Sequence, residues 1–196
     1  VIYYDLAVLT LYKKLNLNYD LVWGGEHMTT NYDTVNFYYK NKVNYTWVSN
    51  DITLRECMEI KENTKSKLMI TLFGYIPMFV SKRHLVKNYL KTFDIKDSSN
   101  VNYIYKEDKK YPLMDSSVTT VYTDFILNGL KEKLLLDYDY IILNSFMIED
   151  SKFSKVLDIF NTVNCENILS KEKELSSMFD NLGKGFFYKE TIYKVK

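Results

Sequence analysis

Four neighbouring residues, Ser81-Lys82-Arg83-His84, form the run in this sequence that is best suited to chemistry. The run lies shortly after Gly74, which we expect to end a buried strand at the rim of the sheet, so that the basic turn after it faces a pocket shared by the strand ends. A guanidinium group binds carboxylates and phosphates through two parallel hydrogen bonds, and the lysine adds a second positive charge. Ser81, Lys82 and Arg83 therefore predict a site for an anionic ligand, with a solvated basic turn as the alternative. His84 by itself is more often structural or exposed than catalytic.

Polar residues at the carboxyl ends of the predicted strands are a second group of candidates. Reactive groups of parallel α/β folds gather at these strand ends, which are marked here by Glu26, Asp51, Gly74 and Asn144. A helix cap or a solvated loop residue is the alternative for each carboxylate. No two of them have a spacing that is diagnostic of general acid and base catalysis.

Several kinds of active site are missing from the sequence. It contains no HExxH motif and no recognisable Ser-His-Asp or Cys-His arrangement. Its two cysteines, Cys57 and Cys165, are too few for a zinc site or an iron–sulfur cluster, each of which usually needs about four ligands. Cys57 falls on the apolar face of a predicted helix, which favours a reduced thiol in the core over a disulfide.

The bulk composition describes a globular chain without a dominant charge. The 196 residues are 46% hydrophobic, which is enough to bury the core of one domain. The net charge of +1 does not single out a nucleic acid or a membrane surface, although a local basic patch could still bind RNA. No apolar run reaches the ~20 residues of a membrane span and no signal peptide is visible, so the cytoplasm is the expected location.

The elements that must position these residues alternate between strand and helix. The clearest helix start is the run from Thr53 to Glu56, which fits a capping box. The apolar run from Leu68 to Phe73 is typical of a strand buried on both faces. The expected strands cover residues 1–4, 21–23, 45–48, 68–73 and 140–143, with a strand-like end at 191–195. The expected helices cover residues 6–15, 31–39, 53–60, 124–136 and 153–160, and a β-hairpin is expected at 103–105 and 111–114, with a further pairing segment at 118–122.

This alternation predicts parallel βαβ units in an α/β fold. A complete (β/α)8 barrel typically needs ~250 residues, so we expect a partial TIM-barrel-like arrangement of parallel strands with a small β-hairpin segment. We expect residues 1–196 to form a single domain, the C-terminal part of a barrel-like family domain. The sequence opens inside a strand-like run at Val1, which favours a missing N-terminal part.

Several separate motifs occur in the order found in one known family. The sequence has a glycine after a buried strand, then a Ser-x-Arg element and an Asn-Tyr pair, at Gly74, Ser81, Arg83, Asn88 and Tyr89. The other matching elements are Thr30-Asn31 followed by Asn36-Phe37-Tyr38, residues 49–56, Tyr111-Pro112 with Asp115, and residues 185–196. With these motifs the sequence resembles peptidase family U32, the collagenase-like peptidases, over nearly its whole length.

The sequence also departs from the family pattern at several polar positions. The signature histidine is Phe73 here, the two signature cysteines are Pro77 and His84, the arginine and glutamate of a Ser-Arg-Glu element are Asn50 and Asp51, and the Gly-Thr-His expected after Asp115 reads Val118-Thr119-Thr120. The chain is therefore identified as a divergent member. The iron–sulfur cluster found in some relatives cannot form from its two cysteines.

The resemblance implies a barrel-like fold and one of two activities. Members are described as collagenase-like proteases, or they take part in hydroxylating the wobble uridine of tRNA, where relatives work with prephenate and sometimes as two different family members together. We expect the second activity, with tRNA and a paralogous family subunit as partners and no cofactor held by this chain itself. The residues expected to bind an anionic carboxylate or phosphate, or the substrate, are Ser81, Lys82, Arg83, Asn31, Asp51 and Gly74. A protease and a non-catalytic scaffold for a paralogue remain the alternatives.

Overall fold

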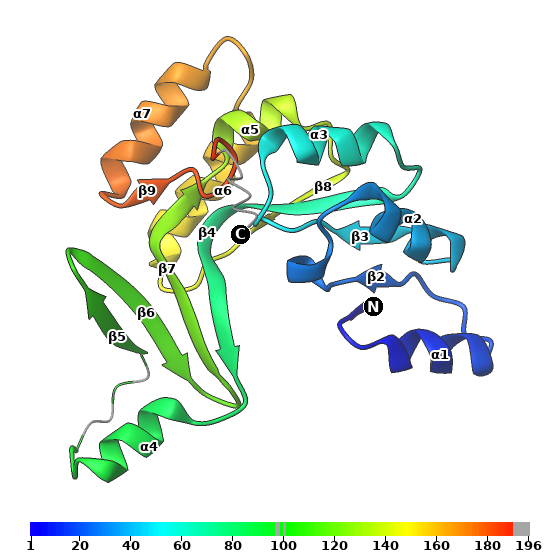
Figure 1. Ribbon diagram of the computed structural model, residues 1–196. Helices are drawn as coiled ribbons and strands as arrows, with labels where there is room; N and C mark the ends of the chain where they lie inside the picture. Colours follow the sequence, from blue (N-terminus) through cyan, green and yellow to red (C-terminus); the bar gives the residue numbers. More distant parts are fainter. Residues whose placement is uncertain (97–98, 100, 190–196) are drawn as a thin grey trace, which may run out of the picture.

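The computed structural model describes residues 1–96, 99 and 101–189. The strands in this part of the chain join one sheet in the order β1-β2-β3-β4-β7-β6-β5, with β8 beside β4 and β9 beside β7. Figure 1 shows two parts of this sheet that meet at β4: a parallel part flanked by helices and an antiparallel part that points away from them.

The parallel part follows the predicted alternation of strand and helix. Its strands are β1 (Ile2–Tyr3), β2 (Val22–Trp23), β3 (Tyr45–Trp47), the start of β4 (Lys67–Ser81) and β8 (Tyr140–Leu143). Its first crossovers contain α1 (Leu6–Lys14), a 3-10 turn at Glu26–Met28, α2 (Tyr32–Lys40) and α3 (Leu54–Glu62). All four neighbouring pairs are parallel, which confirms the α/β prediction.

Local signals place the starts of the crossover helices. Asn31 caps α2, because its side-chain oxygen accepts a hydrogen bond from the amide of Thr34. The predicted capping box of α3 is confirmed: the Thr53 hydroxyl accepts from the Glu56 amide, while the Glu56 carboxylate accepts from the Thr53 amide. These hydrogen bonds lower the pKa of the Glu56 carboxyl group.

The long strand β4 corrects the expectation that a strand ends at Gly74. Gly74 has a φ of +110°, a conformation that favours glycine, and a Cβ added there would lie 2.4 Å from the carbonyl oxygen of Asn144. The strand continues past it to Ser81 with register shifts on both sides of Pro77. Phe73 pairs with Leu143 of β8 and with Asn128 of β7, so these two strands lie on opposite edges of β4 at that point. A single strand therefore serves both parts of the sheet.

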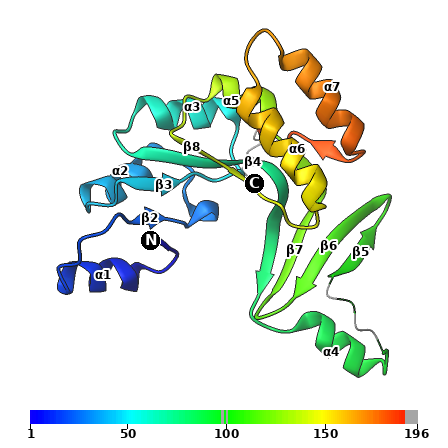
Figure 2. The ribbon, with the colours of Figure 1, turned by 180° about the vertical axis from the view of Figure 1, so that it is seen from behind.

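The antiparallel part, called the arm below, comprises β4 from Tyr75 onward together with α4, β5, β6 and β7. The bounds are Leu85–Thr92 for α4, Val101–Lys106 for β5, Lys109–Asp115 for β6 and Thr119–Asn128 for β7. The predicted hairpin of β5 and β6, and the pairing of β6 with β7, are confirmed. Figures 1 and 2 show α4 at the tip of the arm, far from α5 and α6.

The helix expected at 124–136 is wrong in its first half. Residues up to Asn128 extend β7, which pairs with β4 and with β9 (Leu182–Gly183), and only α5 (Leu130–Leu135) is helical. Gly129 lies between the strand and the helix. Only glycine fits there without a shift of its neighbours, because an added Cβ would lie 2.8 Å from the Leu72 carbonyl oxygen. The apolar spacing of this segment fits a helix as well as a buried strand, and pairing with β4 selects the strand.

The main core lies between the strands and the helices that cover them, which are α2, α3 and the helices that follow β7. It contains Phe73, Leu130 and Phe160, all essentially buried, and also Cys57, a free buried thiol as predicted. The remaining helices are α6 (Asp150–Thr162), which was predicted, and α7 (Ile168–Met178), which was not. The sheet is open over the described residues, so closure into a barrel stays a prediction. The strand expected at 191–195 lies outside the described residues.

A membrane-spanning helix was not expected from the sequence. Among the described residues, none of the helices combines the length and the apolar character that crossing a bilayer requires.

Candidate functional site

A pocket of about 200 Å³ lies where the carboxyl ends of the parallel strands face the arm. We call it the carboxyl-edge pocket. Asn50 and Asp51 line it from the end of β3, and Lys109, Tyr111 and Asp124 line it from the arm. Its other lining residues come from β4, β7 and the turn after β9: Ile76, Pro77, Met78, Thr123, Phe125, Leu127, Gly185, Phe186 and Lys189. This is the edge at which α/β folds gather ligand-binding groups.

Asp51 is the one predicted binding residue that the structure places in this pocket. Its carboxylate lies 3.2 Å from Nδ1 of His27, and both side chains are about half exposed. Its backbone amide donates to the hydroxyl of Ser49, and the neighbouring Asn50 side chain donates to the carbonyl of Thr71 on β4. The end of β3 is thus fixed to β4, with the Asp51 carboxylate at the surface of the pocket.

The arm contributes an ion pair to the same pocket. Nζ of Lys109 lies 3.2 Å from the Asp124 carboxylate. The hydrogen bond to Asp124 and its negative charge raise the pKa of Lys109. A second cation, Lys189, lies over the ring of Phe186 with Nζ 4.6 Å from the ring centroid. The pocket therefore combines an apolar floor with two carboxylates and two ammonium groups.

A buried carboxylate holds the turn that forms one wall of the pocket. Glu132 on α5 is fully buried and accepts hydrogen bonds from Nζ of Lys184, at 3.0 Å, and from the hydroxyl of Tyr188, at 2.7 Å. Burial, followed by the hydrogen bond to Glu132, raises the pKa of Tyr188 to about 12. Between these two anchors, the carbonyl of Phe187 accepts from the amide of Leu54 at the start of α3.

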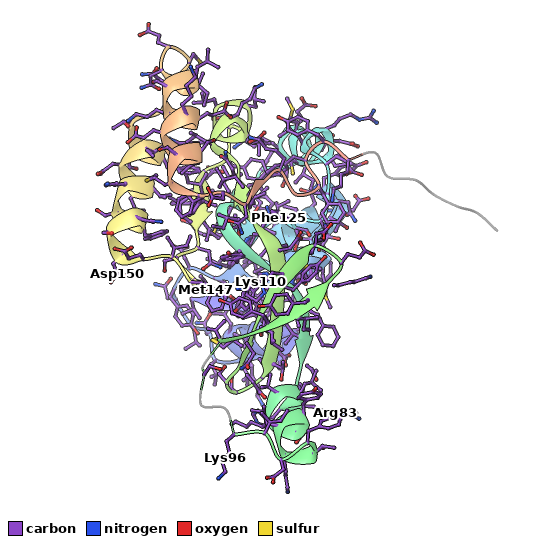
Figure 3. The ribbon with its side chains drawn as sticks, turned by 90° about the vertical axis from the view of Figure 1, so that its left-hand side faces the viewer. Arg83, Lys96, Lys110, Phe125, Met147 and Asp150 are labelled. Atoms are coloured by element: carbon purple, nitrogen blue, oxygen red, sulfur yellow. The ribbon has the colours of Figure 1, made fainter. Side chains whose placement is uncertain are left out.

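The basic turn predicted to face a shared pocket lies elsewhere. The Ser81 hydroxyl accepts a hydrogen bond from the Arg83 amide, and Thr119 donates to the Arg83 carbonyl, so the turn is fixed by backbone contacts. The side chains of Lys82 and Arg83 are exposed. Figure 3 shows Arg83 beside α4 at the tip of the arm, at the opposite end from Phe125. The expectation that this turn faces the strand ends is wrong, because β4 carries it outward beyond Gly74. An anion-binding role for Ser81, Lys82 and Arg83 stays a prediction.

His84 and Asp115 form a structural contact beside this turn. Nδ1 of His84 lies 2.8 Å from the Asp115 carboxylate, which also accepts from the Lys87 amide at 3.1 Å. The Asp115 side chain is only 5% exposed, and burial alone would raise its pKa; the hydrogen bonds from Lys87, His84 and Thr119 outweigh that effect and lower it. No hydroxyl or thiol group hydrogen-bonds to the His84 ring among the described residues. The contact therefore fixes the start of α4.

The other predicted site residues have structural surroundings. Asn31 is the cap of α2, and Gly74 packs on the backbone of Asn144. Asn144 in turn donates to the Tyr75 carbonyl and accepts from the Phe146 amide, which fixes the loop after β8. Glu26 lies in the short 3-10 turn after β2. Asn31, Gly74 and Asn144 do not line the carboxyl-edge pocket.

The structure has a second opening, of about 340 Å³, that was not predicted from the sequence. We call it the hairpin groove, since it runs between the β5–β6 hairpin and the loops after β8 and α7. It is lined by Tyr75, Tyr103, Asp108, Lys109, Lys110, Pro112, Asp124, Met147 and Asn181. The alternation of Tyr103 and Tyr105 in a predicted strand was the available signal, because it puts two aromatic rings on one face.

The donor set for a metal or an iron–sulfur cluster is poor. Over residues 1–96, 99 and 101–189, no three His, Cys, Asp or Glu side chains gather in a way that could hold a metal ion. Cys57 lies in the core and Cys165 on the surface. These thiols do not fit a cluster, which needs several thiolates that converge on one point.

Comparisons with known proteins agree with the motifs of the sequence. Residues 1–135 match the profile of peptidase family U32. The chain is also similar to the tRNA hydroxylation protein P2 of Bacillus subtilis (strain 168), with 26% identity over 214 aligned residues. That alignment covers 96% of this chain and 69% of the Bacillus protein. No solved structure matches the chain.

Proposed function

The chain belongs to peptidase family U32, and from that premise we propose that it contributes to hydroxylation of the wobble uridine of tRNA. The observation that carries the proposal is the similarity to a tRNA hydroxylation protein, which extends over 96% of the chain. This similarity includes the part after residue 135, which lies beyond the match to the family profile. It therefore covers α6, α7 and the turn that closes the carboxyl-edge pocket.

The distribution of charge supports a polyanionic substrate. Residues 81–115 contain eight basic and five acidic residues, while the rest of the chain contains 18 basic and 20 acidic ones. Residues 81–115, which lie in the arm, thus carry a net charge of +3 in a chain whose total is +1. Lys82 and Arg83 are exposed at the tip of the arm, which supports contact with the phosphates of a large ligand.

The carboxyl-edge pocket is the proposed place for a small ligand. Prephenate, with which the family members resembled here work, is a dicarboxylate, and Lys109 and Lys189 are the cations that could pair with it. Asp51 faces the same space and supplies an acceptor for a hydroxyl or an amine. A second family subunit as partner is part of this proposal, since related members sometimes act in pairs.

The peptidase alternative has less support from the geometry. The feature most similar to part of a catalytic triad is the contact between His84 and Asp115. Among the described residues, however, no nucleophile is hydrogen-bonded to that histidine. Cleavage of gelatin or unfolded peptides by the purified chain, abolished by His84→Ala, would reinstate it.

The decisive experiment measures modified nucleosides of tRNA by mass spectrometry. Cells that lack the protein should lose hydroxylated wobble uridine, and the wild-type gene should restore it. We expect Arg83→Ala and Asp51→Ala to restore it poorly while both proteins fold normally, because both side chains are exposed and make few contacts. Full hydroxylation in cells lacking the protein would reject the proposed function.

A further inference from the structure

We propose that the face of the β5–β6 hairpin that carries Tyr103, Tyr105 and Lys110 binds a single-stranded segment of RNA by stacking its bases. This inference rests on the proposed function for the choice of RNA as the ligand. It goes further by assigning the binding to one face of the arm, next to the hairpin groove, and to stacking in addition to charge.

The hairpin pairing puts the three side chains together. Tyr105 pairs directly with Lys110, and Tyr103 with Pro112, so all four side chains point to the same face of the hairpin. The two tyrosine rings have centroids 6.5 Å apart. Nζ of Lys110 lies 3.8 Å from the Tyr103 centroid and 5.9 Å from that of Tyr105. The face is a small aromatic surface with a cation held above it.

The two rings are placed for an external ligand. Tyr105 is 70% exposed and Tyr103 is 37% exposed. Apart from their contacts with each other and with Lys110, no ring contact or cation–π contact of theirs is found in the described part of the chain. Large exposed rings on an edge strand lower solubility and add little to the core. A ligand that covers the two rings is the simplest reason for their presence here.

The groove beside the rings has the size and the polar groups for a nucleotide. Its volume is about 340 Å³, and its far wall contains Met147 and Asn181. In Figure 3, Lys110 and Met147 lie close together in the middle of the molecule, well above Arg83 and Lys96 at the tip. The carboxylates of Asp108 and Asp124 also line it and can accept hydrogen bonds from base N–H groups.

Single-stranded RNA suits this face better than a duplex. Bases that are splayed out of a loop stack on aromatic side chains, whereas the bases of a duplex are already stacked on one another. The wobble position lies in the anticodon loop, which is single-stranded. A base stacked on Tyr105 would leave its phosphate within reach of the ammonium group of Lys110.

The test measures binding of a fluorescein-labelled anticodon stem–loop to the purified 196-residue chain by fluorescence anisotropy. We expect Tyr105→Ala to weaken binding about fivefold or more, because stacking of one base has at least that effect. Tyr105→Phe should retain binding, since it keeps the ring. The control is Tyr39→Ala on α2, a tyrosine that is 37% exposed, like Tyr103, and it should leave the affinity unchanged.

The lysine and the form of the RNA provide two further readouts. Lys110→Ala should reduce the slope of log affinity against log salt by about 0.7, the contribution of one phosphate contact to a single strand. Lys40→Ala, on α2, should leave the slope as it is. A duplex of the stem alone should bind more weakly than the stem–loop, and should not respond to Tyr105→Ala.

The outcomes separate this inference from the proposed function. Wild-type affinity in a protein with both Tyr103→Ala and Tyr105→Ala, or no binding of the stem–loop by the wild type, overturns the inference. The inference is also overturned if that double variant binds RNA normally but no longer binds a second protein chain. The hairpin face would then be a protein interface. The proposed function is judged separately, by whether the wild-type gene restores hydroxylated wobble uridine in cells that lack it.

Discussion

At the scale of single residues, Glu132 is the side chain on which one wall of the carboxyl-edge pocket depends. It is fully buried, and its partners Lys184 and Tyr188 lie on either side of the turn that lines the pocket. A carboxylate taken out of water is tolerated only when such partners satisfy it. The turn and α5 should therefore lose stability together when one member is changed.

The first prediction concerns the hydroxyl of Tyr188. Tyr188→Phe removes one hydrogen bond to a buried charge and should lower the free energy of unfolding by about 1 kcal/mol. Urea denaturation measures this as a lower midpoint with an unchanged slope. Tyr140→Phe is the matched control, because no hydrogen bond of its hydroxyl is found among the described residues. Equal midpoints for both variants would contradict a role for the Glu132 contact.

The second prediction concerns the backbone of Gly74. Gly74→Ala puts a Cβ 2.4 Å from the Asn144 carbonyl oxygen at a φ of +110°, so we expect a loss of about 3 kcal/mol or more. Gly185→Ala serves as comparison: its φ is +56°, and its Cβ would meet only a Leu127 methyl at 3.3 Å. It should cost about 1–2 kcal/mol. Thermal unfolding of both variants checks the order.

At the scale of elements, α4 depends on one carboxylate for its position. Asp115 accepts hydrogen bonds from His84 and from the amide of Lys87, and these contacts hold its pKa below the ordinary value. A lowered pKa in the folded state means that the stabilisation is complete above the pKa of the unfolded chain. It is lost as the pH falls through the folded value.

The third prediction follows from the lowered pKa of Asp115. Amides of α4 should become less protected from hydrogen exchange as the pH falls below about 4, the ordinary range of an aspartate. Asp115→Asn should give weak protection at every pH and remove most of the acid dependence. Asp94→Asn, an exposed acid just after α4, should behave like the wild type. Acid dependence that survives Asp115→Asn would show that another group controls the helix.

Local elements were the part of the fold that sequence reasoning found most reliably. The capping box at Thr53 and the alternation of strands with helices depend on neighbouring residues, and both were predicted correctly. The length of β4 was not, because a glycine between two apolar runs fits a strand end as well as a bend inside a strand. Asn144, which decides between the two, is 70 residues away in the sequence.

The candidate site was predicted less completely for the same reason. Asp51 follows a short parallel strand and was correctly expected at the sheet edge. Lys109 and Asp124 reach the same pocket from β6 and β7, and Lys189 reaches it from the turn after β9. No local pattern in the sequence shows that these segments meet. Arg83 has a type suited to anions, but its position depends on how far β4 extends.

At the scale of the whole molecule, the two parts of the sheet differ in how much they bury. The buried hydrophobic residues concentrate around Phe73, Leu130 and Phe160, whereas α4 contains no buried residue and β5 has mostly exposed ones. Segments with few buried contacts open more readily than a well-packed core.

The fourth prediction is a gradient of hydrogen exchange along β4. Amides between Lys67 and Phe73 should exchange slowly, and those of β5 and α4 should exchange orders of magnitude faster under native conditions. Bound stem–loop RNA should protect β5 more than α6. Uniform protection across the arm and the parallel strands would show that the molecule opens as one unit.

The continuity of β4 has a geometric consequence for the reach of the molecule. A strand advances about 3.3 Å per residue and alternates the direction of its side chains. Two residues inserted after Gly74, matched by two in β7, would move the turn at Arg83 outward by about 7 Å. Each side chain of the strand would keep its face of the sheet. A single inserted residue would reverse those sides unless a bulge took it up, as the register shifts beside Pro77 do. The span between tip and pocket therefore changes most simply in steps of two residues.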